Sequence, residues 1–348
     1  MATPDKITPE NFSEVERAAE RGDLEAQFLL GIYFSGDDGG PPDNDASDRW
    51  TRQAAAGGYP PALHRLAKAS FAMESAPPEL QAEAFAHCQE AALKDYAPAQ
   101  FLMGIFFAEG FGVEKNDQTA FKWYLKAAEA GEPWAIAAIG VAYNNGLGVT
   151  RDFSKALEWF IKGTTVGEVF SMFSYGTILF EGVQTPKNRE KGLDLIMEAA
   201  SKDFSPAQIY LGRLYYIGKD IARDPDIGFN YLREASQNGD DEATAFLSYY
   251  LLNDANYPKK VKLALRFLKE EAKLGNPIAL LGLAVMSASG HGLPQDGDRA
   301  LTLIKISRDL GYEPAGSLLK KLEGMEDPDK ISRALSKIIS LETVFAAS

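Results

Sequence analysis

Residues 99–134 read AQFLMGIFFAEGFGVEKNDQTAFKWYLKAAEAGEPW, and residues 135–170 read AIAAIGVAYNNGLGVTRDFSKALEWFIKGTTVGEVF. Both stretches begin with Ala, carry Gly five residues later and Trp twenty-four residues later. The first residue, once replaced by Ser, recurs every 36 residues, or once after 37: Ala26, Ala62, Ala99, Ala135, Ser171, Ala207, Ala243, Ala279 and Ala315. Self-similarity at one fixed period is typical of stacked repeats, in which each unit packs mainly on its neighbours.

Two helical segments fill each period. In the first, the leading Ala, an apolar residue four positions on and an aromatic residue eight positions on share one helical stripe. The second follows residues of N-cap type, whose side-chain oxygen accepts from first-turn amides: Asp43, Asn116, Asp152, Asn188, Asp224 and Asp296. Glycines suited to a left-handed cap mark its end: Gly58, Gly131, Gly167, Gly239, Gly275 and Gly311.

A third set of glycines lies inside the first helix of the repeat: Gly31, Gly104, Gly140, Gly176 and Gly212. A glycine inside a helix costs roughly 1 kcal/mol in helix propensity. Their recurrence at one register therefore predicts that the two helices pack too closely there for a Cβ atom.

The frame A-x3-[LMI]-G-x2-[YF]-x2-G-x-G-V, followed by K-A-x2-W-x3-A-A-x2-G, resembles the Sel1-like repeat, a 36-residue relative of the tetratricopeptide repeat. The resemblance implies an all-α, right-handed superhelical solenoid of helix-turn-helix repeats. The second and seventh copies depart from the frame, with MESAPPELQ and LNDANYPKKV in place of the Gly-rich turn, and Ser248 replaces the helical glycine. We expect the stack to bend or loosen at these copies.

The resemblance divides the chain into three parts. Residues 23–315 hold eight repeats, and residues 1–22 supply an N-terminal capping helix that opens at Thr8-Pro9-Glu10. Residues 316–348 supply C-terminal capping helices, the last of them opening at Asp327-Pro328 and running to about Thr343. Terminal units of a solenoid cover the apolar face of their neighbours, which is why we assign these segments as caps.

Charge and composition limit the partners that the chain can bind. The formal net charge is -13; residues 1–100 carry 17 acidic and 8 basic side chains, whereas residues 253–348 carry 12 and 14. Nucleic acid is disfavoured, because Lys and Arg drive phosphate binding, and a partner with a basic segment would be steered to the acidic end. No apolar run is long enough to span a membrane, and we see no secretory leader, so we expect a cytoplasmic protein. We also expect it to be a monomer.

Few residues offer chemistry. The lone Cys88 and the histidines His64, His87 and His291 form no nucleophile–base or zinc pattern, so no catalytic residue, metal or cofactor is assigned. The G-x-G pairs lack a GKS/T ending and fall at the turn between two helices, which explains them better than a phosphate loop does. The acidic loop 36–48 departs from the EF-hand frame, so we interpret it as solvated, with Asp43 as a helix cap.

In tetratricopeptide solenoids the first helix lines the concave face. In that alignment, the positions that face the groove are one residue before the leading residue of each repeat and two, six, nine and ten residues after it. The partner-binding residues predicted in this way are Phe101, Ile105, Trp134, Phe170, Phe173, Phe180, Arg213, Tyr216 and Tyr249. Phe101 and Phe173 also suit packing between repeats, whereas Trp134, Phe180, Tyr216 and Tyr249 are hard to assign to a core. Exposed aromatics in a groove are candidate anchors.

The resemblance implies protein–protein interaction. The favoured function is therefore a non-enzymatic scaffold or adaptor that binds a protein or peptide segment in the groove. One alternative is an immunity or inhibitor protein that neutralises a cognate bacterial toxin, since an acidic solenoid suits a basic effector. An alternative of another class is an enzyme or ligand sensor with a site between repeats.

Overall fold

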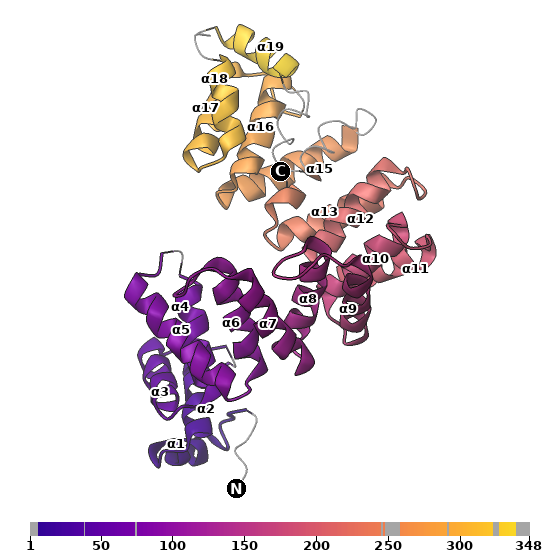
Figure 1. Cartoon of the computed structure of the whole chain (residues 1–348). Coiled ribbons are helices and arrows are strands. Elements are labelled where there is room, and N and C mark those ends of the chain that lie inside the picture. The colour runs from indigo at the N-terminus through magenta and orange to yellow at the C-terminus, as the bar shows by residue number, and fades with distance from the viewer. Residues whose placement is uncertain are drawn as a thin grey trace. The chain divides into compact units, whose positions relative to one another are not determined.

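The computed structural model describes residues 6–37, 39–73, 75–244, 246–247, 258–290, 292–322 and 327–338. Every regular element in these ranges is a helix (Figure 1), which confirms the all-helical prediction. The chain forms two units, residues 1–175 and residues 176–348. Among the described residues, no helix combines the length and hydrophobicity that crossing a bilayer requires.

Among the described residues, the helices follow one another in pairs that match the periods of the sequence. Residues 1–175 contain α1 (Phe12–Glu20), α2 (Leu24–Ser35), α3 (Asn44–Ala56), α4 (Pro60–Phe71), α5 (Pro78–Leu93), α6 (Ala97–Glu109), α7 (Asp117–Glu129), α8 (Pro133–Asn145), α9 (Phe153–Thr165) and the start of α10 (Val169–Glu181). Residues 176–348 contain the rest of α10, α11 (Arg189–Ser201), α12 (Ser205–Ile217), α13 (Pro225–Gln237), α15 (Pro258–Lys273), α16 (Pro277–Ser289), α17 (Gly297–Asp309), α18 (Glu313–Leu322) and α19 (Pro328–Ile338).

The predicted caps are present in the structure. Each of the six Asp and Asn residues accepts a hydrogen bond from a first-turn amide, as Asp43 does from Ala46 N at 3.0 Å and Asn116 from Thr119 N at 2.9 Å. The six end glycines all have positive φ, from 78° at Gly58 to 91° at Gly311. Asp95 and Asp203, with φ of 60° and 58°, take this position in the repeats that lack the glycine. The boundaries of the second helix were therefore predictable from local chemistry.

The glycines inside the first helix lie where the second helix comes closest. A Cβ atom at Gly140 would lie 2.6 Å from Cε1 of Phe160, and one at Gly212 would lie 2.5 Å from Cγ of Leu232. Gly104 faces the ring of Tyr124 in the same way. The prediction of close helix–helix packing at these positions is confirmed.

Glutamine side chains tie consecutive repeats together. The residue after the leading Ala is Gln in three repeats, and its Nε2 atom donates to a carbonyl near the end of the preceding helix pair. Gln27 donates to Ala19 O at 3.0 Å, and Gln100 and Gln208 donate to the carbonyls of Ala92 and Ala200 at 3.2 Å. These carbonyls also accept from the backbone amides of Gly22, Asp95 and Asp203, which follow the helix ends. The glutamine therefore adds a second hydrogen bond to each carbonyl, and this bond links consecutive repeats.

The second glycine of each G-x-G pair lies at a contact between repeats. Gly112 and Gly148 have φ of 67° and 68°, and a Cβ atom on either would meet the carbonyl oxygen of Gln81 or Asp117 in the first turn of the preceding second helix. Left-handed geometry and lack of space both favour glycine here. The turn interpretation of these glycines is confirmed.

The second copy lacks the Gly-rich turn but still folds as a helix pair, α4 and α5. Pro77 and Pro78 start α5 without a side-chain cap. The buried residues of both helices, among them Leu63 and Cys88, share one core with Met103 and Phe106 of the third copy. Stacking on the neighbour therefore stabilises a pair whose own turn has lost the consensus residues.

The first and last described helices pack on the terminal repeats. Helix α1 starts two residues after the predicted Thr8-Pro9-Glu10 and buries Val15 and Ala19 against Leu30 of α2. At the other end, Asp327 accepts from Asp329 N at 3.0 Å and caps α19. Ile331 and Leu335 of α19 are buried against residues of α16, α17 and α18. Residues 339–348, on which the predicted end at Thr343 falls, lie outside the described residues.

The half-buried His64 in α4 makes stability depend on pH. Burial, and next the charge of Lys68, lower the pKa of His64 to about 4, and the ring lies 5.6 Å from that of Tyr96. Below pH 6.5 the unfolded chain takes up a proton at this residue that the folded chain does not, so stability falls as pH drops toward 4. We expect His64 to lower the free energy of unfolding by about 1 kcal/mol at pH 5.5 relative to pH 7.5. Urea unfolding of wild type and His64→Gln at both pH values measures the difference, and an equal loss in both proteins would contradict the assignment.

Candidate interaction surface

Of the predicted partner-binding residues that the structure describes, Trp134 is the large apolar side chain that stands exposed. It lies at the start of α8, directly after Pro133, and 56% of its surface is accessible. Helical side chains pack toward the preceding turn, and the second residue of a helix has no such turn beneath it. The prediction that Trp134 faces solvent is confirmed.

The other predicted residues of the first unit are half-buried. The Phe101 ring lies 5.6 Å from that of Tyr124, and the Phe170 ring lies 6.4 Å from that of Phe160. Ile105 packs against the core that contains Met103, and Phe173 is half-buried as well. These four side chains contribute to the packing of neighbouring helices and present only part of their surface.

In the second unit, the predicted exposure of Phe180 is wrong. Only 2% of its surface is accessible, and its ring meets that of Tyr210 edge-on at 6.3 Å. The physical reason lies in α11: a Cβ atom on Gly192 would come within 2.6 Å of Phe180 N, so the backbones of α10 and α11 approach so closely that the ring is enclosed. Phe180 is a core residue.

Tyr216 and Arg213 are engaged with neighbours in the same unit. Tyr216 is half-buried beside the core of α12 and α13, with the Arg223 guanidinium 5.4 Å above its ring. Arg213 is exposed and lies 4.6 Å above the ring of Phe246. Tyr249 lies outside the described residues, as do Ser248 and His291.

Trp134 is one of three exposed apolar residues near the junctions between successive helix pairs of the first unit. Leu93 (67% accessible) ends α5, Trp134 is the second residue of α8, and Val166 (53%) directly follows α9. We call these three residues the turn row. Leu93 and Val166 occupy the same position of the repeat, 31 residues after the leading Ala, and so do Leu274 and Leu310 of the second unit. This recurrence was the signal available in the sequence.

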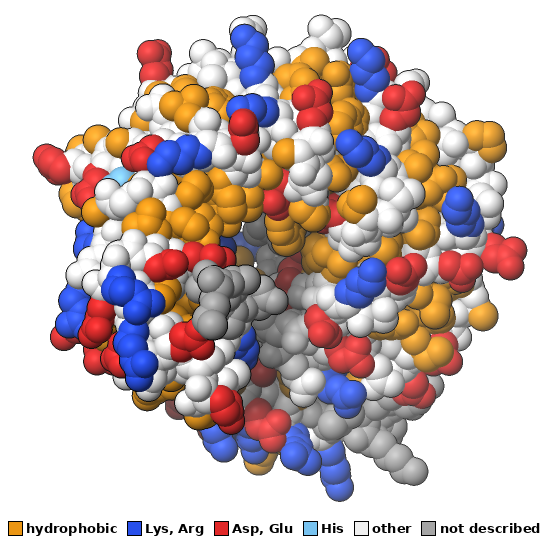
Figure 2. All heavy atoms as spheres, turned by 90° about the horizontal axis from the view of Figure 1, so that it is seen from below, with side chains coloured by type: hydrophobic (Ala, Val, Ile, Leu, Met, Phe, Trp, Pro, Cys, Tyr) orange, Lys and Arg blue, Asp and Glu red, His pale blue; other side chains and the backbone are white. Residues whose placement is uncertain are grey.

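Carboxylates accompany the turn row. Glu132 at the start of α8 is partly buried, and that burial raises the pKa of its carboxyl. Lys94 and Lys126 beside the row are held in ion pairs, 2.9 Å from Glu90 and 2.8 Å from Asp95. More widely, acidic, basic and hydrophobic side chains are interspersed on the face shown in Figure 2, and no single sign of charge covers it.

Cys88, Asp43 and Asp48, which carry reactive or ligating groups, make structural contacts. The Cys88 thiol is buried and lies 3.3 Å from Ala99 O, and burial raises its pKa to about 12. In the acidic loop, Asp43 caps α3 and Asp48 pairs with Arg52 at 2.7 Å. Among the described residues, no three His, Cys, Asp or Glu side chains converge as metal ligands would.

Because its thiolate is disfavoured and shielded, Cys88 should resist thiol reagents in the folded protein. Reactivity follows the thiolate fraction and access to the sulfur, so we expect a rate with a chromogenic disulfide at pH 8 roughly 100-fold lower than that of the urea-unfolded chain. Absorbance kinetics under both conditions measure the ratio. Equal rates would mean that Cys88 is accessible and that the core around α5 is not closed.

Comparisons with known proteins agree with this architecture. The model of the Sel1 repeat matches residues 24–59, 97–132, 135–165, 169–204, 205–240, 241–276 and 277–312, and leaves the atypical second copy unmatched. The chitin synthase regulator SKT5 of Saccharomyces cerevisiae is 32% identical over 131 residues, which is 36% of this chain but only 18% of that protein.

Two solved structures share the fold. A protective antigen of uropathogenic Escherichia coli strains is 28% identical, with a TM-score of 0.59 over 97% of this chain and 72% of that one. A Sel1 repeat protein from Oxalobacter formigenes is 23% identical, with a TM-score of 0.57 over 66% of this chain and 97% of that one. Together with the seven matched repeats, the helix pairs, caps and inter-helix glycines show that this chain is a member of the Sel1 repeat family.

Proposed function

We propose that this protein is a non-enzymatic scaffold whose first unit binds a segment of a partner protein along the turn row. The observation that carries the proposal is that three successive junctions between helix pairs each present an apolar side chain to solvent: Leu93, Trp134 and Val166. Trp is among the residues that most often dominate interface energies. The row supplies one anchor flanked by two smaller contacts.

The spacing of the row favours an extended ligand. Packed helices lie about 8–10 Å apart, so Leu93 and Val166, which occupy equivalent positions two repeats apart, should be separated by about 20 Å, with Trp134 between them in the chain. An extended chain rises about 3.3 Å per residue. A partner segment with an apolar residue at every third position would therefore meet all three side chains, with the largest on Trp134.

Electrostatics favour a segment that also carries basic residues. Glu132 lies next to the anchor, while the nearby lysines are paired with Glu90 and Asp95. The first 100 residues carry a net charge of -9, from 8 basic and 17 acidic side chains. Such a field steers a basic partner and raises its rate of association.

Photo-crosslinking tests the proposal. With p-benzoylphenylalanine at position 134, we expect a protein-sized adduct in the native cell that excess unmodified protein competes away. The matched control places the same residue at Ile161, an exposed apolar position on α9 outside the turn row. An adduct of equal yield at Ile161, or none at position 134, would contradict binding along the row.

A further inference from the structure

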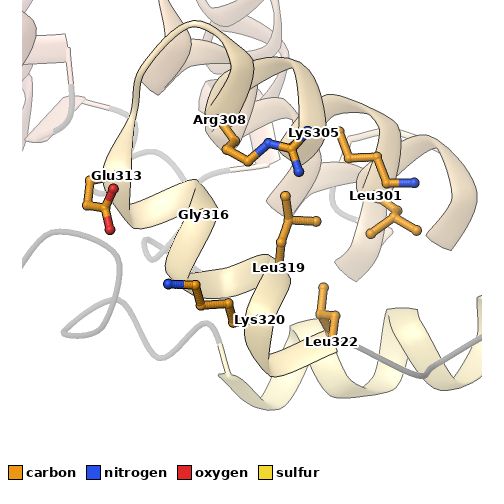
Figure 3. Close-up of a pocket in the computed structure, with 8 residues that line it drawn as sticks. All are labelled: Leu301, Lys305, Arg308, Glu313, Gly316, Leu319, Lys320 and Leu322. Atoms are coloured by element: carbon orange, nitrogen blue, oxygen red, sulfur yellow. The ribbon is translucent and has the colours of Figure 1, made fainter.

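A pocket of about 500 Å³ lies between α17 and α18 in the second unit (Figure 3). Its wall is apolar, formed by Leu301, Leu319 and Leu322. Charged side chains surround this wall: Lys305 and Arg308 from α17, and Glu313 and Lys320 from α18. The volume lies within the range of about 300–1,000 Å³ that is usual for ligand sites in proteins.

Gly316 keeps the pocket open. It lies inside α18, where glycine disfavours the helix, yet a Cβ atom there would meet only Arg308 Cγ at 3.6 Å, an ordinary contact. Gly140 and Gly212, by contrast, have neighbours at 2.6 and 2.5 Å that leave no room for a Cβ atom. Packing therefore explains those glycines but not Gly316, whose missing side chain leaves space in the pocket.

The pocket is cationic although the chain is strongly acidic. Among the described lining residues, Lys305, Arg308 and Lys320 are basic and Glu313 is acidic, whereas the whole chain carries -13. Arg308 is also paired with Asp309 at 2.6 Å, so the two lysines supply most of the attraction for an anion. Both are exposed, and so their charges stand at the open edge of an apolar depression.

We propose that this pocket binds an acidic segment of a partner protein, with one bulky apolar side chain inserted against the three leucines and neighbouring carboxylates on Lys305 and Lys320. The opposite charge of pocket and segment selects the partner, and the leucines select an apolar residue within it. A peptide fits better than a free small molecule because all four charged lining residues are exposed, whereas small-ligand sites enclose most of their ligand. The proposal is independent of the turn row, which lies in the other unit.

Fluorine NMR tests the proposal with a defined probe. The hexapeptide DEFLDE, with 4-fluorophenylalanine at its third position, is titrated with the full-length protein. We expect a saturable shift of the fluorine signal that weakens as salt is raised, because the lysines are exposed to screening. The unlabelled peptide DESSDE should not displace the probe, and the labelled peptide KKFLKK should not bind.

Three variants assign the binding to this pocket. Gly316→Leu fills the space and should weaken binding at least tenfold without lowering the melting temperature, since it replaces a helical glycine at a site with room. Lys305→Gln combined with Lys320→Gln should also weaken binding at least tenfold. Glu313→Gln removes the acidic charge among the described lining residues and should strengthen binding two- to fivefold.

Several outcomes would overturn the proposal. Unchanged affinity in a folded Gly316→Leu variant, or equal binding of DESSDE or KKFLKK, would show that the pocket does not select an acidic, apolar segment. Free 4-fluorophenylacetate binding as tightly as the peptide would indicate a small-carboxylate site instead. Concentration-dependent self-association in sedimentation velocity that Gly316→Leu abolishes would identify a second copy of the chain as the occupant.

Discussion

Gly140→Leu should destabilise the first unit by about 3 kcal/mol or more, the largest effect that we expect from a single substitution. A Cβ atom at this position would lie 2.6 Å from Cε1 and 2.7 Å from Cδ1 of Phe160, so α8 and α9 must separate to admit a side chain. Overpacking of a well-packed interior costs roughly 1–3 kcal/mol and sometimes more, and a leucine adds four heavy atoms at the closest point of contact. Repeats that stack on the separated pair lose contacts as well.

Thermal and urea unfolding measure this loss, and the same substitution at Gly316 is the matched control. Both glycines lie inside helices, but only Gly140 has a neighbour closer than 3 Å. We expect Gly316→Leu to keep or raise the melting temperature and Gly140→Leu to lower it. If both variants had the melting temperature of the wild-type protein, α8 and α9 would not be in the contact that the structure describes.

Trp134→Ala should weaken binding of the partner roughly 30-fold, a loss of about 2 kcal/mol, while the melting temperature stays within about 2 °C of wild type. The indole is 56% accessible, so its removal leaves no cavity in the core. The partner identified by crosslinking is purified in its free form, and its titration against the wild-type protein and the variant measures the loss of affinity. Leu93→Ser and Val166→Ser remove smaller side chains and should each have a smaller effect in the same direction.

Phe180→Ala is the control for this interpretation, because the sequence analysis gave Phe180 and Trp134 the same role. Only 2% of the Phe180 side chain is accessible to solvent, so its truncation should lower the free energy of unfolding by about 3–5 kcal/mol. If the folded fraction of the Phe180→Ala variant binds the partner with wild-type affinity, the result agrees with a core role for Phe180. If instead Trp134→Ala unfolded the protein and Phe180→Ala did not, the assignment of the two residues would be reversed.

The repeat architecture was predictable from the sequence because it depends on local rules that recur at one register. Asp43 and its counterparts cap a helix through a hydrogen bond to an amide three residues away, and Gly58 and its counterparts end one through their own backbone angles. Neither rule needs knowledge of a distant residue. Predicting the close packing at glycines such as Gly140 needed one further step, the inference that a repeated cost in helix propensity implies a repeated contact.

The interaction surfaces were predicted less well, because they depend on neighbours that the repeat pattern does not specify. The alignment gave Trp134 and Phe180 equivalent roles, but Gly192 in α11 brings two backbones together and encloses one of them. Gly316 directly follows Ala315, outside the register of the packing glycines, so the repeat pattern predicts no contact for it, and only the structure shows the empty space beside its Cα atom. The sequence by itself therefore determined the repeat, its helices and its caps, all set by contacts within a few residues. Only the tertiary structure decided which side chains reach solvent and where a pocket forms, because accessibility is set by every element packed around a residue.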